Sequence, residues 1–287
     1  MLNIRISEIS GTGFDYLKNL QSLSLRFCHE INHLGTSMSD LQVLSLDGCD
    51  LIRDEHFAKL SSLKMLSLDE CGGITGSAFD YLKNIQFLRL KSCDAINHLG
   101  TGMSSLQELN LWWCNSIKDE HFVNLSNLKR LYLGDCHGIK GSGFDYLKNI
   151  QLIYLEHCYE INHLGTDLSG LQELELSFCN SIKDEHFSNL SSLERLTLDG
   201  CEGITGSVFA YLKNIQHLKL RQCNGLNHLG TSMGSLKELE LVDCNNIKEE
   251  HFEHMNTLEK LFIDKCQGIS ESGIEYLKSI QKIDKQV

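Results

Sequence analysis

The sequence contains no proline in 287 residues, only two tryptophans and no long uninterrupted apolar run. A membrane-spanning helix needs about 18 or more consecutive apolar residues, so no span is predicted. The first residues, Met1–Ile6, lack the basic and apolar regions of a signal peptide. Positive charge is also scarce, because 38 acidic residues outnumber 26 lysines and arginines and give a formal net charge of -12. This balance disfavours nucleic acids and anionic membranes as partners.

Motifs of common catalytic and metal sites are missing as well. The chain has no phosphate-binding G-x-x-x-x-G-K-[ST] loop and no dinucleotide-binding G-x-G-x-x-G. No two cysteines lie within two to four residues of each other, as the cysteine ligands of a zinc site usually do. We therefore predict that the protein is not an enzyme and that it holds no cofactor and no metal.

Twelve cysteines at nearly constant spacing are what the sequence has instead. Successive cysteines from Cys28 to Cys266 are 21 or 22 residues apart. Each ends the phrase L-x-x-L-x-L-x-x-C, in which some units have isoleucine for leucine. A fixed period of about 20–30 residues is typical of a solenoid. We predict a single domain over 1–287 with about 12 repeats of 21–22 residues.

Each repeat has room for one strand and a short outer element. The final L-x-L of a unit, such as Leu88 and Leu90, alternates with the period of two that is typical of a strand. The stretch around Phe79 and Leu82 has helical spacing and predicts a short helix or turn. We expect an α/β solenoid: a curved horseshoe with a concave parallel β-sheet and short helices or turns on the convex side.

The cysteines occupy inward-pointing positions of the repeat, where a free thiol behaves as a small buried hydrophobic group. Side chains stacked in parallel are poorly oriented for the torsion that a disulfide bond requires. We therefore expect free thiols, and with them a reducing, intracellular and cytoplasmic location.

A second period of 65 residues lies above the first, because three unlike units form a block that recurs. One unit carries I-N-H-L-G-T, the next D-E-H-F and the third F-D-Y-L-K-N. The motifs stand at Ile31–Thr36, Ile96–Thr101 and Ile161–Thr166; at Asp54–Phe57, Asp119–Phe122 and Asp184–Phe187; and at Phe14–Asn19, Phe79–Asn84 and Phe144–Asn149. This self-similarity indicates growth by duplication of a three-repeat cassette.

The phrase L-x-x-L-x-L-x-x-C, followed by Ile74-Thr75 or Ile204-Thr205, resembles the cysteine-containing leucine-rich repeat. Such repeats occur in the substrate-receptor half of F-box ubiquitin ligases and in bacterial effectors. The unit Cys93–Leu109 is also similar to repeats of plant intracellular immune receptors. The resemblance implies a leucine-rich-repeat fold that binds other proteins. This chain departs from the pattern in its shorter units, in its lack of proline and in having no F-box, nucleotide-binding or kinase segment.

The outward-pointing strand positions vary, whereas the loop motifs hardly change. The column after the second leucine reads Ser24, Ser45, Ser67, Arg89, Asn110, Tyr132, Tyr154, Glu175, Thr197, Lys219, Glu240 and Phe262. Uniform drift would change the outer loops as much as the strands, so a constant frame with a variable face favours recognition through the concave sheet. The alternative is that the constant convex loops, with their His and Asp residues, bind a partner or a metal.

Aromatic residues narrow the predicted site to the repeats between residues 87 and 178. Both tryptophans lie on one strand, with other aromatic residues on its neighbours and charged residues on either side. Exposed rings on a rigid sheet are typical interface anchors. For Trp113 and Phe178, which precede cysteines, local packing in the turn is an equally open interpretation. The predicted partner-binding residues are Phe87, Arg89, Lys91, Glu108, Asn110, Trp112, Trp113, Arg130, Tyr132, Tyr154, Glu156 and Glu175.

Eight of the thirteen histidines belong to the constant motifs. Aligned on the cysteines, His33 falls beside Asp54 of the next unit, and the pair recurs every 65 residues. A zinc site needs three or four converging ligands, whereas three strand spacings separate successive pairs by about 14 Å. We therefore interpret these residues as structural pairs.

The sequence thus predicts a non-enzymatic leucine-rich-repeat protein that recognises a protein or peptide through its concave face. It would act as a free-standing effector or adaptor, or as the recognition half of a ubiquitin ligase or an intracellular immune receptor. We expect no nucleic-acid and no membrane partner. A homodimer through uncapped repeat ends is a further expectation, since repeat arrays normally need polar caps.

Overall fold

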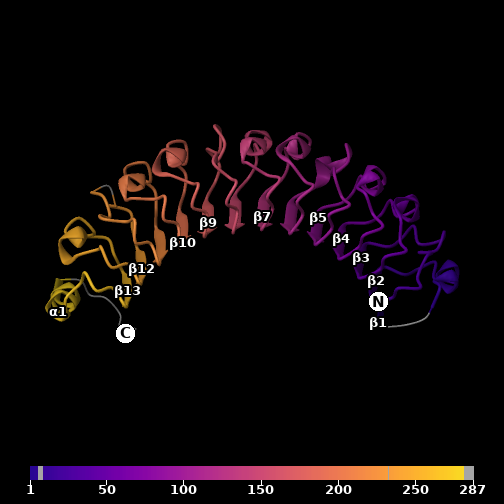
Figure 1. Ribbon diagram of the computed structural model, residues 1–287, viewed down its shortest axis with the longest axis horizontal. Coiled ribbons are helices and arrows are strands. Elements are labelled where there is room, and N and C mark those ends of the chain that lie inside the picture. Colours follow the sequence, from indigo (N-terminus) through magenta and orange to yellow (C-terminus); the bar gives the residue numbers. More distant parts are fainter. Residues whose placement is uncertain (6–8, 232, 281–287) are drawn as a thin grey trace. The chain divides into compact units, whose positions relative to one another are not determined.

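The computed structural model describes residues 1–5, 9–231 and 233–280, and the chain divides into two compact units, Met1–Asn149 and Ile150–Val287. Each unit is a stack of repeats in which a short strand alternates with a turn region (Figure 1). No helix in the described ranges is long and apolar enough to cross a membrane. This division does not test the prediction of a single domain over 1–287, which remains a prediction.

Parallel strands form the constant part of each repeat. The first unit contains β1 Leu2–Arg5, β2 Ser22–Arg26, β3 Val43–Asp47, β4 Met65–Asp69, β5 Phe87–Lys91, β6 Glu108–Trp112 and β7 Arg130–Gly134. The second contains β8 Leu152–Glu156, β9 Glu173–Ser177, β10 Arg195–Asp199, β11 His217–Arg221, β12 Glu238–Val242 and β13 Lys260–Asp264. Within each unit every strand pairs with the next in one unbroken register, so equivalent residues form columns across the strands.

The outer elements are mostly single 3-10 turns, in line with the predicted short helices or turns. They are η1 Thr12–Tyr16, η2 Asp54–Phe57, η3 Ser77–Tyr81, η4 Met103–Ser105, η5 Asp119–Phe122, η6 Ser142–Tyr146, η7 Asp184–Phe187, η8 Ser207–Ala210 and η9 Glu249–Phe252. An α-helix, α1 Glu271–Ile280, follows β13. Within each unit these elements lie on the convex side and the strands on the concave side (Figure 1). The predicted α/β repeat solenoid is confirmed.

The core between strands and turns is built from the periodic apolar positions. Leu88 and Leu90 are almost completely buried, as are Phe79 and its counterparts on the outer turns. All twelve cysteines are free and buried, which confirms their predicted inward position. The Cys71 thiol donates to the carbonyl oxygens of Asp69 (3.4 Å) and Leu46 (3.7 Å). Burial raises the pKa of Cys71 to about 12, so this thiol is a packing group and not a nucleophile.

Candidate functional site

From β2 onward the strand face of each unit consists of the side chains at the first, third and fifth residues of its strands; in β1 it consists of Asn3 and Arg5. From β2 onward these positions are half-buried or exposed, with Gly134 as the one buried member. From β2 to β12 the second and fourth positions point into the core and are buried. Tyr132 and Tyr154 are both half-buried on the strand face, as the sequence predicts.

In the first unit the predicted site residues form three adjacent columns on β5, β6 and β7. The columns are Phe87–Glu108–Arg130, Arg89–Asn110–Tyr132, and Lys91–Trp112 beside Gly134. Cross-strand ion pairs hold part of this surface. Arg130 Nε lies 2.7 Å from Glu108 Oε2, and Lys91 Nζ lies 3.4 Å from Asp69 Oδ2. Arg89 is exposed. The strands therefore bring these predicted residues together.

The two tryptophans form the largest aromatic surface of this unit. Trp112 lies over the backbone of Gly134, where an added Cβ would overlap its ring. The ring centroids of Trp112 and Trp113 are 5.9 Å apart, and Lys91 Nζ lies 5.7 Å from the Trp113 ring. Trp113 is 43% exposed, so it does not tuck into the core of the turn. The Trp112 ring thus packs against a glycine on the next strand, and the two tryptophans form an aromatic surface on the strand face.

A further column, not predicted from the sequence, is formed by the residue that follows the last strand residue in each repeat. The residue just before each cysteine has a positive φ, for example Trp113 at 52° and Phe178 at 54°. Ten of these twelve positions carry residues other than glycine, although the left-handed region costs such residues about 1–2 kcal/mol. Gly48 and Gly200 in the same column were the sequence signal that could have revealed it.

In the second unit the predicted residues Tyr154, Glu156 and Glu175 lie on β8 and β9. Tyr154 pairs in register with Glu175, and its hydroxyl donates to the Glu156 carboxylate. Burial raises the pKa of the Glu175 carboxyl, and the negative charge of Glu173 adds to this effect. Burial also raises the pKa of Asp199 on β10, with a further contribution from Glu156 against the opposing effect of Arg221. The charge of Lys219 opposes the effect on Glu175 without offsetting it, so both carboxyls keep raised pKa values.

Unpaired polar atoms also gather on the strand face. Among the described residues three buried side-chain oxygens lack a hydrogen-bond partner: Oδ1 of Asp69, of Asn110 and of Asp199. All three belong to strand-face columns, on β4, β6 and β10. Buried acceptors in proteins are rarely left unsatisfied, so these three oxygens are unusual features of the strand face.

The constant residues of the convex side are occupied by bonds within the frame. Asp54 accepts hydrogen bonds from Thr75 N, Thr75 Oγ1 and Ala78 N at 3.1, 2.6 and 3.2 Å. His56 Nδ1 accepts from the backbone N–H of Arg53 at 2.9 Å and so caps η2. These bonds give the constancy of the motifs a structural reason, since they join each repeat to the next.

The predicted neighbour of His33 was wrong. His33 Nε2 lies 3.0 Å from Asp15 Oδ2, on the preceding repeat, whereas Asp54 binds the repeat that follows it. The alignment on cysteines places His33 and Asp54 at equivalent positions of neighbouring repeats. It does not tell whether each side chain faces the preceding or the following repeat. Over the described parts of the chain no group of three or more His, Cys, Asp or Glu residues could hold a metal ion.

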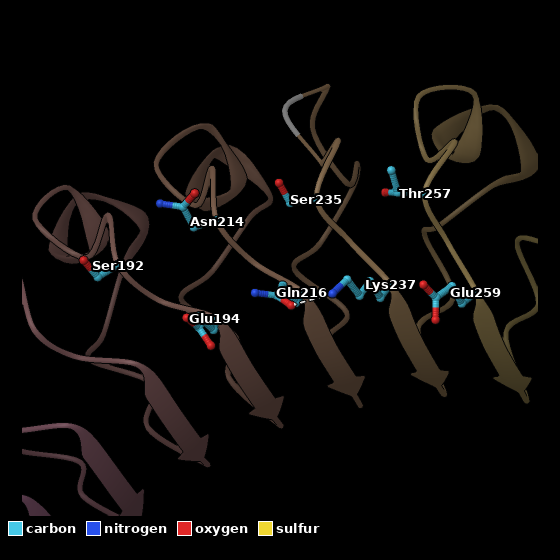
Figure 2. A pocket seen from close by; sticks show the side chains of 8 residues that line it. All are labelled: Ser192, Glu194, Asn214, Gln216, Ser235, Lys237, Thr257 and Glu259. Atoms are coloured by element: carbon cyan, nitrogen blue, oxygen red, sulfur yellow. Dashed lines mark hydrogen bonds between the residues drawn. The ribbon is translucent and has the colours of Figure 1, made fainter.

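A polar pocket of about 650 Å³ lies at the start of strands β10 to β13 in the second unit. Figure 2 shows its lining, to which four successive repeats contribute two residues each: Ser192, Glu194, Asn214, Gln216, Ser235, Lys237, Thr257 and Glu259. Asn214 Nδ2 donates to the Ser191 carbonyl and Thr257 Oγ1 to the Leu236 carbonyl, both at 2.8 Å. Asn84 makes the equivalent bond to Ser61 in the first unit. The pocket is therefore lined by groups that join neighbouring repeats.

The sequence contains one spacing typical of a serine nucleophile. Gly230–Gly234 has the spacing G-x-S-x-G, but it lies between two parallel strands, β11 and β12. A nucleophile elbow instead joins a strand to a helix. Several buried thiols, such as Cys49 and Cys201, have their pKa raised to about 11 by burial. The arrangement of the strand face suits binding.

Comparison with protein families matches the chain to the BspA type leucine rich repeat region, in six copies over residues 51–168, 115–233 and 166–281. The comparison with curated proteins found no match. The predicted relation to cysteine-containing leucine-rich repeats is thereby confirmed. Repeats of this kind typically serve as binding scaffolds, with the sheet as an extended surface.

Solved structures with a similar fold include chains of two complexes and a bacterial internalin. A chain of the TLR13-ssRNA13 complex has 20% identity over 86% of this chain and a TM-score of 0.69. A chain of the Drosophila Toll–Spatzle complex has 15% identity over 96% and a TM-score of 0.66. An internalin of Listeria monocytogenes has 19% identity over 93% and a TM-score of 0.61, with 86% of its own chain covered. This chain spans only 40% and 43% of the first two. At such identities the likeness shows the fold.

Proposed function

Because this chain belongs to the BspA-type leucine-rich repeat family, we propose that it is a non-enzymatic protein that recognises another protein or peptide through its strand face. The observation that carries the proposal is the cluster on β6 and β7. There Trp112 and Tyr132 are half-buried and Trp113 is exposed, on two neighbouring strands of the face.

The physical basis is a rigid surface with large anchors. The strands are held in register by the sheet, so a partner orders few side chains on binding. Trp112 is immobilised on Gly134, and a tryptophan buried at the centre of an interface is worth about 2 kcal/mol or more. The ion pairs Lys91–Asp69 and Arg130–Glu108 surround this centre with polar groups. An aromatic centre with a charged rim is the usual anatomy of a protein interface.

The biological setting is part of the same proposal. Free thiols throughout the core are compatible with a cytoplasmic protein, and an adaptor, an effector or the recognition half of a larger receptor would all use such a face. The Toll and RP105 structures with this fold are complexes with Spatzle and MD-1, which supports a protein partner. The TLR13 structure is a complex with ssRNA. The net charge of -12 argues against nucleic acid for this chain.

Affinity purification with matched variants tests the proposal. The double variant Trp112→Ala, Tyr132→Ala removes the anchors, and Tyr81→Ala, Tyr146→Ala removes two tyrosines of the convex turns, each more than 40% exposed. A specific partner captured by the wild type should lose at least about tenfold in affinity with the first variant, from a loss of about 1.4 kcal/mol or more. The second variant should bind normally.

Equal retention by both variants would contradict recognition through this face, provided that each melts as the wild type does. Loss only with the convex variant would move the site to the outer turns. Single-stranded RNA is tested in parallel, and we expect no binding at physiological salt. RNA binding that depends on Trp112 would replace the protein partner in the proposal.

A further inference from the structure

The charges on the strand face of the second unit are distributed unevenly. On β11 to β13 several of them are paired: Arg221 contacts Glu240 at 2.5 Å, and His217 contacts Glu238 at 3.0 Å. On β8 to β10 the acidic residues are Glu156, Glu173, Glu175 and Asp199, which we call the acidic face. Two cations lie nearby: Arg195 on β10 is in register with Glu173, and the charge of Lys219 on β11 acts on Glu175. Within the described ranges no lysine or arginine forms an ion pair with any of these four.

An aromatic platform stands at the end of the same strands. The rings of His157 and Phe178 are stacked, with centroids 5.0 Å apart and planes within 8°. Phe178 also lies against Gly200 of the next repeat, where an added Cβ would be 2.5 Å from two ring carbons. His157 Nε2 is 3.9 Å from Glu156, which joins the platform to the acidic face. The two rings are fixed in place and remain half-buried at the surface.

Both platform residues are held in an unfavourable backbone conformation. His157 has φ 52° and Phe178 φ 54°, in the left-handed region. Gly200 occupies the same column with φ 60°, so the frame accepts glycine there. A side chain at this position is strained, whereas glycine adopts the conformation freely. Ten of the twelve positions in this column carry side chains, and among them His157 and Phe178 place two stacked rings beside the acidic face.

We propose that the acidic face and the platform together bind an arginine-rich segment of another protein. A guanidinium group donates paired hydrogen bonds to a carboxylate and also stacks on aromatic rings, so arginine uses both halves of this surface. Lysine offers a single compact charge that cannot stack in this way. The inference rests on the proposed function of the strand face and names the chemistry of the partner.

The titration of the acids supports this assignment. Burial raises the pKa values of Glu175 and Asp199, which means that their ionised forms are disfavoured in the free protein. A bound cation restores the balance, because an opposite charge nearby favours the ionised carboxylate. The free protein thus retains at Glu175 and Asp199 charges that its surroundings disfavour and that a basic partner would neutralise.

Fluorescence anisotropy with labelled peptides of eight arginines or eight lysines tests the proposal at physiological salt. The wild type should bind the arginine peptide at least about threefold more tightly than the lysine peptide, because only arginine stacks. Glu173→Gln, Glu175→Gln should weaken arginine-peptide binding at least about tenfold. The control Glu185→Gln, Glu202→Gln removes the same charge from exposed positions off the strand face and should change binding less than about twofold.

If the double variant of the acidic face and the control double variant weakened binding equally, the effect would come from net charge alone and the proposal would be overturned. Equal binding of the arginine and lysine peptides by the wild type would also overturn it. Phe178→Ala should remove the preference for arginine while leaving lysine-peptide binding nearly unchanged. Thermal melts check folding, and the Glu173→Gln, Glu175→Gln variant should melt no lower than the wild type. Trp112→Ala, Tyr132→Ala lies in the first unit and should leave arginine-peptide binding intact, so failure of the anchor site and failure of the acidic face are distinguishable.

Discussion

Two aspartates show how the convex turns differ from the strand face. Asp119 on η5 accepts hydrogen bonds from the backbone N–H groups of Lys140, Gly141 and Gly143 at 3.1, 3.0 and 3.0 Å. Asp199 on β10 has a buried oxygen with no hydrogen-bond partner and a raised pKa. The first carboxylate joins two repeats, whereas the ionised form of the second is disfavoured by its surroundings in the free protein.

The difference explains why one face of the repeat is constant and the other varies. A residue such as Asp119 cannot change without leaving three donors of the next repeat unsatisfied. A residue such as Asp199 can change without loss to the fold. Duplication copies both kinds, and afterwards only the strand face is free to take on new chemistry.

The largest effect that this comparison predicts is on folding stability. Asp119→Ala should lower the free energy of unfolding by about 2 kcal/mol, because the N–H groups lose a charged acceptor. Asp199→Ala should change it by no more than about 0.5 kcal/mol in either direction, as expected of a surface position that makes no needed bond. Chemical denaturation of both variants gives the two values. Similar losses from the two substitutions would remove the distinction between frame and face.

Much of the frame follows from the sequence because it rests on periodicity. The phrase around Leu88 and Leu90 fixes the strand, its register and the inward cysteines, since an alternating pattern has one way to bury its leucines. The candidate residues of the first unit follow from the same alternation, which puts Trp112 beside Tyr132. The length of the outer elements does not follow, because a single 3-10 turn and a short helix have nearly the same apolar spacing.

Side-chain direction at the turns could not be read from the sequence. The positive φ of Trp113 breaks the alternation after the strand, so this ring leaves the plane that a period of two predicts. The partner of His33 depends on which neighbouring repeat its ring faces. The packing of Phe178 against Gly200 could be predicted only by knowing that its ring fits the space beside a glycine of the next repeat. Such facts depend on three-dimensional contact between units that sequence position does not encode.

The next largest effect is on the pH dependence of the melting temperature, which depends on histidines of the convex turns. In four repeats a histidine of the constant motif accepts a backbone hydrogen bond through Nδ1 at 2.9 to 3.1 Å, at His56, His121, His186 and His251. Burial lowers the pKa of each ring, and a second histidine of the preceding repeat lowers it further, against the opposing effect of an adjacent glutamate. Protonation of Nδ1 would break the cap.

The sign follows from the lowered values. A histidine whose pKa is lower in the folded chain contributes its full stability above about pH 6.5, the unfolded value, and loses it as the pH falls through the folded value. The melting temperature should therefore fall between pH 7 and pH 5. Replacing the four histidines by asparagine, whose oxygen accepts at any pH, should flatten this dependence. An unchanged slope would show that the caps do not control it.

The smallest predicted effect concerns the column before the cysteines, where frame and face meet. Gln222 is exposed, has φ 50° and donates its backbone N–H to Val242 O at 2.9 Å. Gln222→Gly relieves the left-handed strain of about 1 kcal/mol and adds an entropic cost of about 0.5 kcal/mol, so stability should rise by about 0.5 kcal/mol.

Lys219→Gly on the same repeat is the matched control. Lys219 occupies an ordinary strand position of β11, where glycine brings only the entropic cost, so stability should fall by about 0.5–1 kcal/mol. Opposite signs at two exposed positions three residues apart, measured by chemical denaturation, would show that this column is strained by its backbone. Equal losses would mean that the side chains before the cysteines serve the fold, and the case for a functional platform at His157 and Phe178 would weaken accordingly.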